Sequence, residues 1–303
     1  MSELVRLKQQ IKSIQTTRKI THAVRLVSMS LYARLEKQNT GLDYYMDNIK
    51  RCLLDLVAGS GGIEWKNDLL FPDDILDSTP LYIIISSAKG LCGSFNSSLF
   101  RYIERSLFIE EHQSPRFIIV GQKAMRFVNS KGWGDVICHY SELNSGNYIS
   151  IANDLVNKIL TSKSVPSSIV FFNNFLKSFF IQEPTKTVFT PLSLDGIFSK
   201  KTAPSAQNSN EQSEETKAPS ADYVWEQEPQ DVLDSVAISY IKVFIMNVLF
   251  QSLLAEQAAR FLAMDSATTN ADKYLDKLVL HYNKQRQSAI TREVAELSTG
   301  MIP

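Results

Sequence analysis

The chain has 303 residues, a hydrophobic content of 44% and a formal net charge of zero at pH 7. These values are ordinary for a soluble assembly component with one or two domains. Its three cysteines, Cys52, Cys92 and Cys138, are widely spaced and odd in number, which argues against a disulfide framework or a zinc site and fits a reducing compartment. The N-terminus enters a charged helix directly, without the apolar core of a signal peptide.

The charges are unevenly distributed along the chain. Residues 1–40 carry eight Lys or Arg against Glu3 and Glu36, whereas residues 200–231 carry three Lys against seven Asp or Glu. A basic helix can bind nucleic acid or an anionic membrane, but it more often forms a solvated face or matches an acidic protein partner. No aromatic interleaving and no base-reading motif accompanies these basic residues, so we expect no nucleic-acid partner.

Residues 1–50 form the first predicted element, an N-terminal coiled-coil helix. No Pro or Gly falls before Gly41, which predicts one helix of nearly forty residues. Its apolar residues alternate in steps of four and three, with a phase slip after the first four: Leu4, Leu7, Ile11, Ile14, Ile20, Val24, Val27, Leu31 and Leu35. Such spacing is typical of a helix that packs on a partner helix.

Residues 75–195 alternate strand and helix patterns. Short apolar, β-branched runs predict strands at 81–85, 117–120, 136–138, 168–172, 179–182 and 185–189, and helical patterns are found near 96–108, 122–130 and 149–160. This order predicts a central open α/β domain, Rossmann-like, with a partly parallel sheet and helices packed against it.

The turn after the first strand, residues 86–96, is the obvious place to look for chemistry. Gly90 and Gly93 predict a structural turn with a positive φ angle at a glycine. A Walker loop or a dinucleotide fingerprint needs differently spaced glycines, so we predict no cofactor and no metal there. Cys92 could be a nucleophile, but no His lies near it in sequence, and His139 or His281 would need fortuitous placement.

Residues 200–221 are rich in Ser, Ala, Asn, Gln, Glu and Pro. They cannot bury enough apolar surface to offset the entropy of ordering, so we expect a disordered acidic loop, an inert insertion rather than a regulatory element. A short segment, residues 222–230, then leads into the last helix.

Residues 231–303 predict a C-terminal coiled-coil helix of about seventy residues, roughly 100 Å long, because Gly300 and Pro303 come only at its end. Apolar residues with alternating spacing form two groups separated by a phase slip: Ala271, Leu275, Leu278 and Tyr282, then Ile290, Val294, Leu297 and Met301. We expect this helix to wind antiparallel around the N-terminal helix. Residues 236–255 contain Lys242 and several polar side chains, so we interpret them as a helix buried on several sides rather than a membrane span.

Four stretches resemble the gamma subunit of F-type ATP synthases. They are residues 11–24 (IKSIQTTRKITHAV), 90–96 (GLCGSFN), 256–264 (EQAARFLAM) and 282–293 (YNKQRQSAITRE). The resemblance covers essentially the whole chain except residues 200–221, in the right order.

The resemblance implies a rotor subunit without catalytic residues. In the family, the two terminal helices turn inside a hexamer of alternating alpha and beta subunits, and the α/β domain lies at the foot against epsilon and the c-subunit ring. The nucleotide sites belong to the partner subunits, one gamma copy serves each complex, and the complex is peripheral to the cytoplasmic face of the bacterial inner membrane.

Six residues match family positions that contact partners. Arg260, Gln287 and Thr291 match positions that touch the alpha/beta hexamer, and the foot residues that meet the c ring and epsilon are Tyr223, Glu226 and Glu228. The sequence departs from the family pattern at three positions: Leu31 replaces a Lys, Trp225 replaces a Tyr, and Gln227 replaces a Pro. These departures indicate a divergent or alternative bacterial form.

Two other interpretations start from the bare pattern. A coiled-coil structural adaptor unrelated to ATP turnover would show the same helix periodicity, but the four motif matches argue against it. An α/β enzyme that uses Cys92 or the glycine turn would require nucleotide binding or turnover by the isolated chain.

Overall fold

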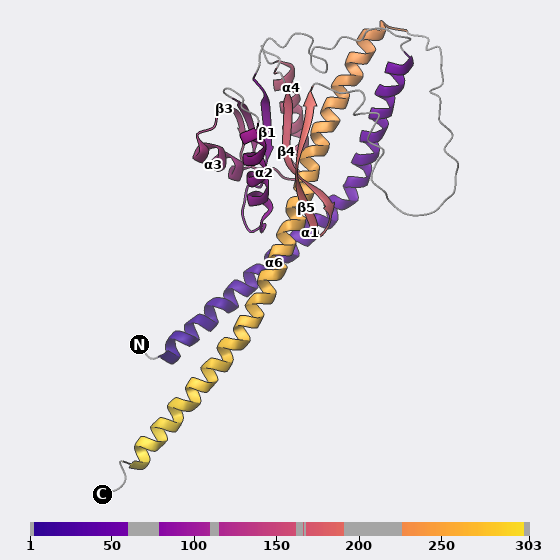
Figure 1. Cartoon of the computed structure of the whole chain (residues 1–303). Coiled ribbons are helices and arrows are strands. Elements are labelled where there is room, and N and C mark those ends of the chain that lie inside the picture. The colour runs from indigo at the N-terminus through magenta and orange to yellow at the C-terminus, as the bar shows by residue number, and fades with distance from the viewer. Residues whose placement is uncertain are drawn as a thin grey trace. The chain divides into compact units, whose positions relative to one another are not determined.

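The computed structural model describes residues 3–59, 79–109, 115–161, 166, 168–190 and 226–299. The loop expected at residues 200–221 lies outside these ranges. Figure 1 shows the elements in chain order, which are α1 (Glu3–Gly59), β1 (Leu81–Ile85), α2 (Phe95–Ile109), β2 (Arg116–Val120), α3 (Gln122–Lys131), β3 (Asp135–Tyr140), α4 (Tyr148–Leu160), β4 (Ile169–Ser178), β5 (Ile181–Thr190) and α6 (Pro229–Thr299).

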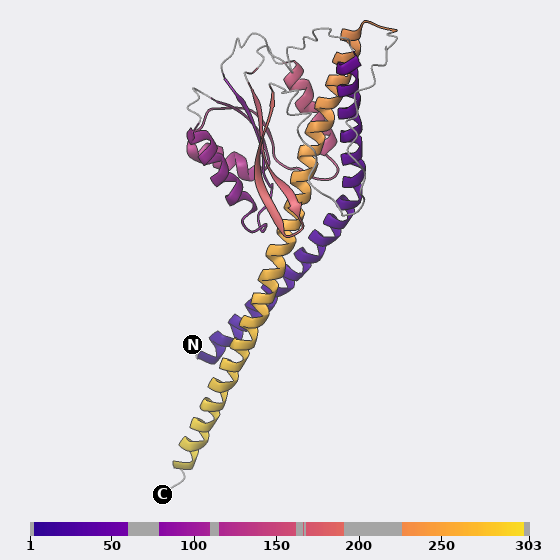
Figure 2. The same ribbon diagram turned by 45° about the vertical axis from the view of Figure 1, so that its right-hand side comes forward.

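The described chain divides into two compact units. Unit 1 contains Met1–Ala33, Leu91–Gly93 and Gln257–Pro303, and unit 2 contains Arg34–Gly90 and Ser94–Glu256. Each unit therefore holds part of α1 and part of α6, and unit 2 also holds the sheet. Within each unit, the parts of α1 and α6 run antiparallel (Figure 1 and Figure 2). The predicted fold class, an antiparallel pair of terminal helices with a central α/β domain, is confirmed.

The sheet of unit 2 has five strands in the order β3-β2-β1-β4-β5. The pairs β1–β2, β1–β4 and β2–β3 are parallel, and β4–β5 is antiparallel. The predicted partly parallel sheet is confirmed. Parallel neighbours require helical crossovers that cover the sheet, which explains why all five residues of β1 are buried.

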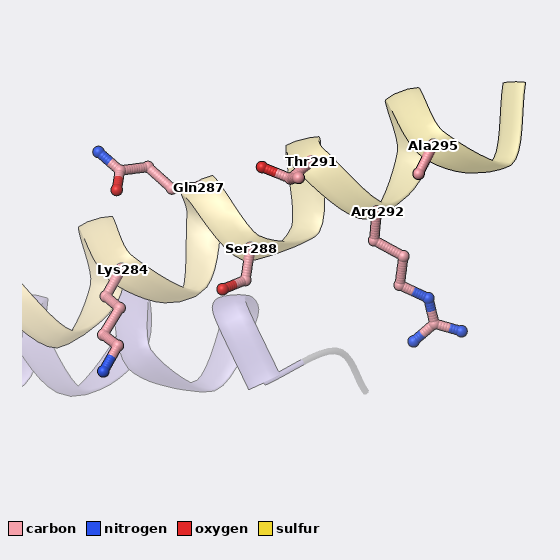
Figure 3. A pocket seen from close by; sticks show the side chains of 6 residues that line it. All are labelled: Lys284, Gln287, Ser288, Thr291, Arg292 and Ala295. Carbon is pink, nitrogen blue, oxygen red and sulfur yellow. The ribbon is translucent and has the colours of Figure 1, made fainter. Parts of the chain in front are cut away.

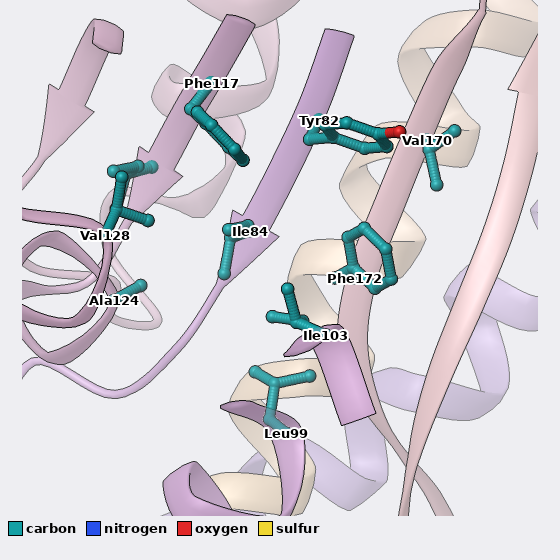
Figure 4. Close-up of a cluster of buried hydrophobic side chains, with 10 residues drawn as sticks. Tyr82, Ile84, Leu99, Ile103, Phe117, Ala124, Val128, Val170 and Phe172 are labelled. Atoms are coloured by element: carbon teal, nitrogen blue, oxygen red, sulfur yellow. The ribbon is translucent and has the colours of Figure 1, made fainter. Parts of the chain in front are cut away.

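One face of the sheet packs on α2 and α3 (Figure 4). The Tyr82 ring on β1 lies 5.7 Å from both the Phe117 ring on β2 and the Phe172 ring on β4, measured between centroids. The helices complete this core with four small or aliphatic side chains, Leu99, Ile103, Ala124 and Val128. The alternating residues of each strand point to the opposite face.

The opposite face packs on the part of α6 that belongs to unit 2. Measured between ring centroids, Phe244 lies 5.6 Å from Phe171 and 4.7 Å from Phe189. The Phe250 ring lies 5.4 Å from the ring of Tyr148 at the start of α4. Eight consecutive residues of α6, 249–256, are buried. Among the described helices, α6 is the one long and apolar enough to cross a membrane. Of residues 236–255, which the sequence predicted to be buried on several sides, residues 249–255 are all buried, whereas Ile238 and Lys242 are exposed. The core of unit 2 therefore accounts for part of the apolarity of this stretch.

The structure corrects the predicted last strands. Two short strands were expected, at 179–182 and 185–189, whereas β5 is one strand that continues through Pro184, and Phe179 and Phe180 form the turn before it. Proline has no N–H to donate to a neighbouring strand. It is tolerated here because β5 is the edge strand of the sheet.

The helix α1 is longer than the sequence predicted, because it continues through Gly41 to Gly59. A glycine within a helix costs about 1 kcal/mol relative to Ala. In unit 2, Leu35 and Leu53 on either side of Gly41 are 2% and 0% exposed. Burial of these side chains offsets the local cost of the glycine.

In unit 1, the face of α1 that packs on α6, here called the seam, differs from the prediction. Ile20 and Val27 were expected in it, but they are 56% and 59% exposed, whereas Thr21 and Ser28 are 9% and 1% exposed. The predicted phase slip is therefore wrong. The steps of four and three continue unbroken through polar residues, and the seam consists of Leu7, Ile11, Ile14, Arg18, Thr21, Arg25 and Ser28.

The seam of α6 also differs from the prediction near its end. Leu275 and Leu278 are 9% and 8% exposed, as expected for a seam, but Ile290, Val294 and Leu297 are 47%, 60% and 71% exposed. Because α1 begins at Glu3, which lies opposite His281, the last turns of α6 have no residue of α1 beside them among the described contacts. Ile290, Val294 and Leu297 of the predicted second group therefore do not pack on α1, and Met301 lies outside the described residues.

Replacing Phe171 by Ala should destabilise unit 2 by about 3–5 kcal/mol, because a fully buried ring is lost and the cavity closes only partly. Phe175→Ala removes the same side chain from the same strand, but Phe175 is 45% exposed. Its cost should stay below about 1 kcal/mol. Chemical denaturation followed by near-ultraviolet circular dichroism measures both changes, and equal losses would contradict the assigned core face.

Replacing Leu278 by Asp should destabilise the helix pair by roughly 3–5 kcal/mol, because the substitution leaves an unpaired charge in the seam. Leu280→Asp is the matched control, since Leu280 is 73% exposed two residues further along the same helix. Thermal melting followed at 222 nm compares the two variants. If Leu278→Asp melted like the control, the assigned seam of α6 would be incorrect.

Candidate partner-binding surfaces of the helix pair

The centre of the seam in unit 1 is polar. Arg25 Nη1 on α1 lies 2.6 Å from Asp265 Oδ1 on α6. A second ion pair joins Arg18, seven residues earlier on α1, to Asp272, seven residues later on α6. Between these ion pairs, the hydroxyl oxygens of Thr21 and Thr268 lie 2.9 Å apart. Polar contacts within a helix pair fix its register at some expense of stability. The ion pairs are partly exposed, so each contributes about 0–1 kcal/mol.

An apolar stripe on α1 lies about one residue's rotation away from the seam. This outer stripe consists of Ile20, Val24, Val27 and Leu31, again in steps of four, three and four. Ile20 and Val27 are more than half exposed, and Val24 and Leu31 are half-buried. An apolar stripe that stays exposed on a helix pair is typical of an interaction surface. The apolar spacing in the sequence predicts these four residues in the contact between the two helices, whereas the structure places them beside it.

Two of the predicted partner contacts lie together near the end of α6. Gln287 and Thr291 are exposed and four residues apart, so they share one face of the helix. They border a shallow hollow (Figure 3), which is lined by Lys284, Gln287, Ser288, Thr291, Arg292 and Ala295. Amide, hydroxyl and cationic groups can donate hydrogen bonds to acidic or carbonyl groups of a partner protein. The exposed apolar residues Ile290, Val294 and Leu297 follow on the same helix.

The third predicted contact, Arg260, lies elsewhere on α6. It is half-buried, and its Nη1 donates a hydrogen bond to Gln257 Oε1 at 3.1 Å. Thirty-one residues of helix separate it from Thr291, a distance of about 45 Å along the axis. The three predicted residues therefore do not form one site, and they could contact only a partner that follows the helix or several partners.

The predicted foot residues are only partly described. Tyr223 and the departure at Trp225 lie outside the described residues. Glu226, Gln227 and Glu228 are exposed immediately before α6, and the Glu228 carbonyl accepts hydrogen bonds from the Asp231 and Val232 amides at 3.0 and 3.3 Å. Carboxylates at this position are favoured by the helix dipole. The two glutamates therefore present negative charge at the start of α6.

The turn between β1 and α2 is held by side-chain hydrogen bonds. Asn96 Oδ1 accepts from the Ser87 amide at 3.1 Å, and Asn96 Nδ2 donates to Ser87 Oγ at 2.7 Å. Gly90 precedes Leu91, whose φ is 65°, an angle that non-glycine residues rarely adopt. Among the described residues, no group of three or more His, Cys, Asp or Glu side chains could hold a metal ion.

Gly93 shows why part of this turn needs glycine. Its φ is 58°, and a Cβ added there would lie 3.4 Å from the Ala263 Cβ on α6, in the same unit. Glycine adopts this backbone conformation without steric cost and allows the close approach. The neighbouring Cys92 thiol is 2% exposed. A nucleophile buried to this extent is poorly accessible to a substrate.

A family model and individual relatives match this chain over nearly its whole length. A family model described as ATP synthase matches residues 3–302. An ATP synthase gamma chain of Clostridium perfringens is 30% identical over 301 residues, which cover 98% of this chain and 96% of that protein. A gamma chain of Rickettsia prowazekii is 27% identical over 305 residues, and the alignment covers 99% of both chains.

Solved structures share the fold. A chain from the rotor of Euglena gracilis mitochondrial ATP synthase matches with a TM-score of 0.61 at 14% identity, covering 95% of this chain and 98% of that one. A chain from the OSCP/F1/c-ring structure of the same enzyme gives 0.63 at 14% identity, with 98% and 93% covered. Because the family model and the 30% identical relative both span nearly the whole sequence, the chain belongs to the ATP synthase gamma-chain family.

Proposed function

We propose that this chain is the central rotor subunit of an F-type ATP synthase. The helix pair of unit 1 turns inside a hexamer of alternating alpha and beta subunits, and the α/β domain contacts epsilon and the c-subunit ring. Membership of the gamma-chain family supports this assignment. One structural observation carries it: the helix pair leaves an apolar stripe and a projecting helix end exposed, although both have the periodicity of packed surfaces.

The exposed surface of the helix pair is chemically uneven around its axis. The outer stripe is apolar, whereas the hollow around Gln287 and Thr291 is polar and cationic. A shaft with such a surface contacts three otherwise equivalent beta subunits differently at any instant. Such a contact shifts the conformational equilibrium of a beta subunit only by the difference between its binding free energies to the two conformations. Rotation would therefore change the affinity of each catalytic site for nucleotide in turn.

The catalytic sites would lie on the partner subunits. In this chain, the turn after β1 is closed by the hydrogen bonds between Ser87 and Asn96, and its glycines do not have the spacing of a Walker loop. We therefore assign the chain a coupling role without catalysis. The bacterial relatives support a location at the cytoplasmic face of the bacterial inner membrane, peripheral to it through the complex.

The assignment is tested by co-expression with the alpha and beta subunits of the same organism. We expect a stoichiometric complex whose ATPase activity drives rotation of a probe fixed to this chain. Purification of the chain alone, with alpha and beta forming active hexamers that never retain it, would contradict the rotor function.

Replacing Gln287 and Thr291 together by Ala should weaken assembly or ATPase activity of the complex without changing the circular dichroism of the isolated chain. Each side chain would lose a hydrogen bond worth about 0.5–1.5 kcal/mol net. The matched control is Lys273→Ala with Lys277→Ala, which removes two exposed polar side chains at the same spacing outside the hollow. Full assembly and activity in the Gln287/Thr291 variant would remove these residues from the contact.

The isolated chain should neither bind nor hydrolyse ATP appreciably. The physical reason is the lack of a phosphate-binding loop at the β1–α2 turn. Isothermal titration calorimetry with ATP and Mg²⁺ provides the measurement. A dissociation constant in the micromolar range, with 1:1 stoichiometry, would show that the chain has a nucleotide site of its own.

A further inference from the structure

A cluster of four reactive or charged side chains lies between β3 and α4 in unit 2, and none of them belongs to the surfaces described above. Cys138 and Tyr140 are two residues apart on β3, so they lie on the same face of the strand. Asp154 and Lys158 are four residues apart on α4, so they lie on the same face of the helix. The packing of α4 against β3 brings the four side chains together.

Lys158 is the centre of this cluster. Its Nζ lies 2.7 Å from Asp154 Oδ2, 3.0 Å from the Tyr140 hydroxyl and 3.0 Å from Cys138 Sγ. The ammonium also lies 5.0 Å from the centroid of the Tyr140 ring, within the range of a cation–π contact. Tyr140 completes the arrangement with a short hydrogen bond to Asp154. The lysine side chain is thus held in place by three groups.

The charge state of Lys158 follows from these contacts. The hydrogen bond to Asp154, with smaller contributions from Cys138 and Tyr140, raises the pKa of Lys158. The hydrogen bond from Lys158 in turn lowers the pKa of Asp154. Both groups therefore remain charged at neutral pH, and a fixed positive charge lies beside the Cys138 sulfur.

The Lys158 ammonium lies at hydrogen-bonding distance from the Cys138 sulfur, and a cysteine beside a lysine is typical of reactive thiols in proteins. Cys138 is also only half-buried as a residue. From this geometry we propose that Cys138 is the reactive thiol of the chain and a site of reversible oxidation by hydroperoxides. The proposal does not depend on the rotor function.

The chemistry is a two-electron oxidation of sulfur. The Cys138 thiolate attacks one oxygen of the hydroperoxide, an S–O bond forms and the O–O bond breaks, giving a sulfenic acid. The peroxide is reduced, and its second oxygen leaves as hydroxide or alkoxide, which takes a proton from Lys158 or from water. A second thiol can condense with the sulfenic acid and release water, which makes the modification reversible.

The other two cysteines provide internal comparisons. Cys52 is exposed on α1, whereas Cys92 is buried at 2% exposure. If accessibility alone controls reactivity, Cys52 is the most reactive thiol. If a neighbouring ammonium controls it, Cys138 is the most reactive thiol. The order of reactivity therefore distinguishes the two explanations.

The test uses the full-length protein at pH 7, treated with hydrogen peroxide and a dimedone probe, with labelling of each cysteine followed by peptide mass spectrometry. We expect Cys138 to be labelled roughly tenfold faster than Cys52, as suits a thiol beside a cation. Lys158→Met should slow labelling of Cys138 by about the same factor and leave the labelling of Cys52 unchanged. Lys158→Arg should restore most of the rate at Cys138.

The control variant is Lys177→Met, which removes an exposed lysine paired with Glu183 on the neighbouring strand. It should leave the labelling of Cys138 unchanged. Faster labelling of Cys52 than of Cys138 in the unmodified protein would overturn the proposal without any variant. An unchanged Cys138 rate in a folded Lys158→Met variant would also overturn it.

Discussion

The antiparallel register of α1 and α6 is the constraint on which the surface of the helix pair depends. Arg18, Thr21 and Arg25 face Asp272, Thr268 and Asp265 in one continuous run of polar contacts. A rotation of α1 by about one residue would bury the outer stripe instead, and each aliphatic side chain so buried would contribute about 1.5–3 kcal/mol. That alternative would leave the charged residues of α6 without their partners, which disfavours it.

The register that satisfies the polar groups leaves apolar area unburied, and this links the packing to the proposed function. Ile20 and Val27 remain in solvent on α1, and Ile290, Val294 and Leu297 remain in solvent beyond the start of α1. A rotor shaft must hold its own two helices together and still contact the subunits that surround it. Polar contacts inside and apolar side chains outside meet both requirements, at the expense of stability in the isolated chain.

The long helix α6 has two different environments within one continuous element. Residues 249–256 are all buried in unit 2, and the polar side chains of Gln251, Ser252 and Glu256 are buried with their apolar neighbours. From Met264 to Leu278, only a narrow face is buried, which is the pattern of a helix pair. The same helix therefore belongs to the core of unit 2 and also supplies one of the two helices of the pair in unit 1.

The sequence alone determined the length of α6, the β-α alternation and the family, because Pro and Gly placement, hydrophobic period and motifs are local properties. Tertiary structure decided which face of α1 is buried. Thr21 and Ser28 are buried in preference to Ile20 and Val27 only because the acidic and hydroxyl groups of α6 lie opposite that face. It also decided that β5 continues through Pro184, because that depends on being an edge strand. The contact between Cys138 and Lys158, twenty residues apart, arises only when α4 packs on β3.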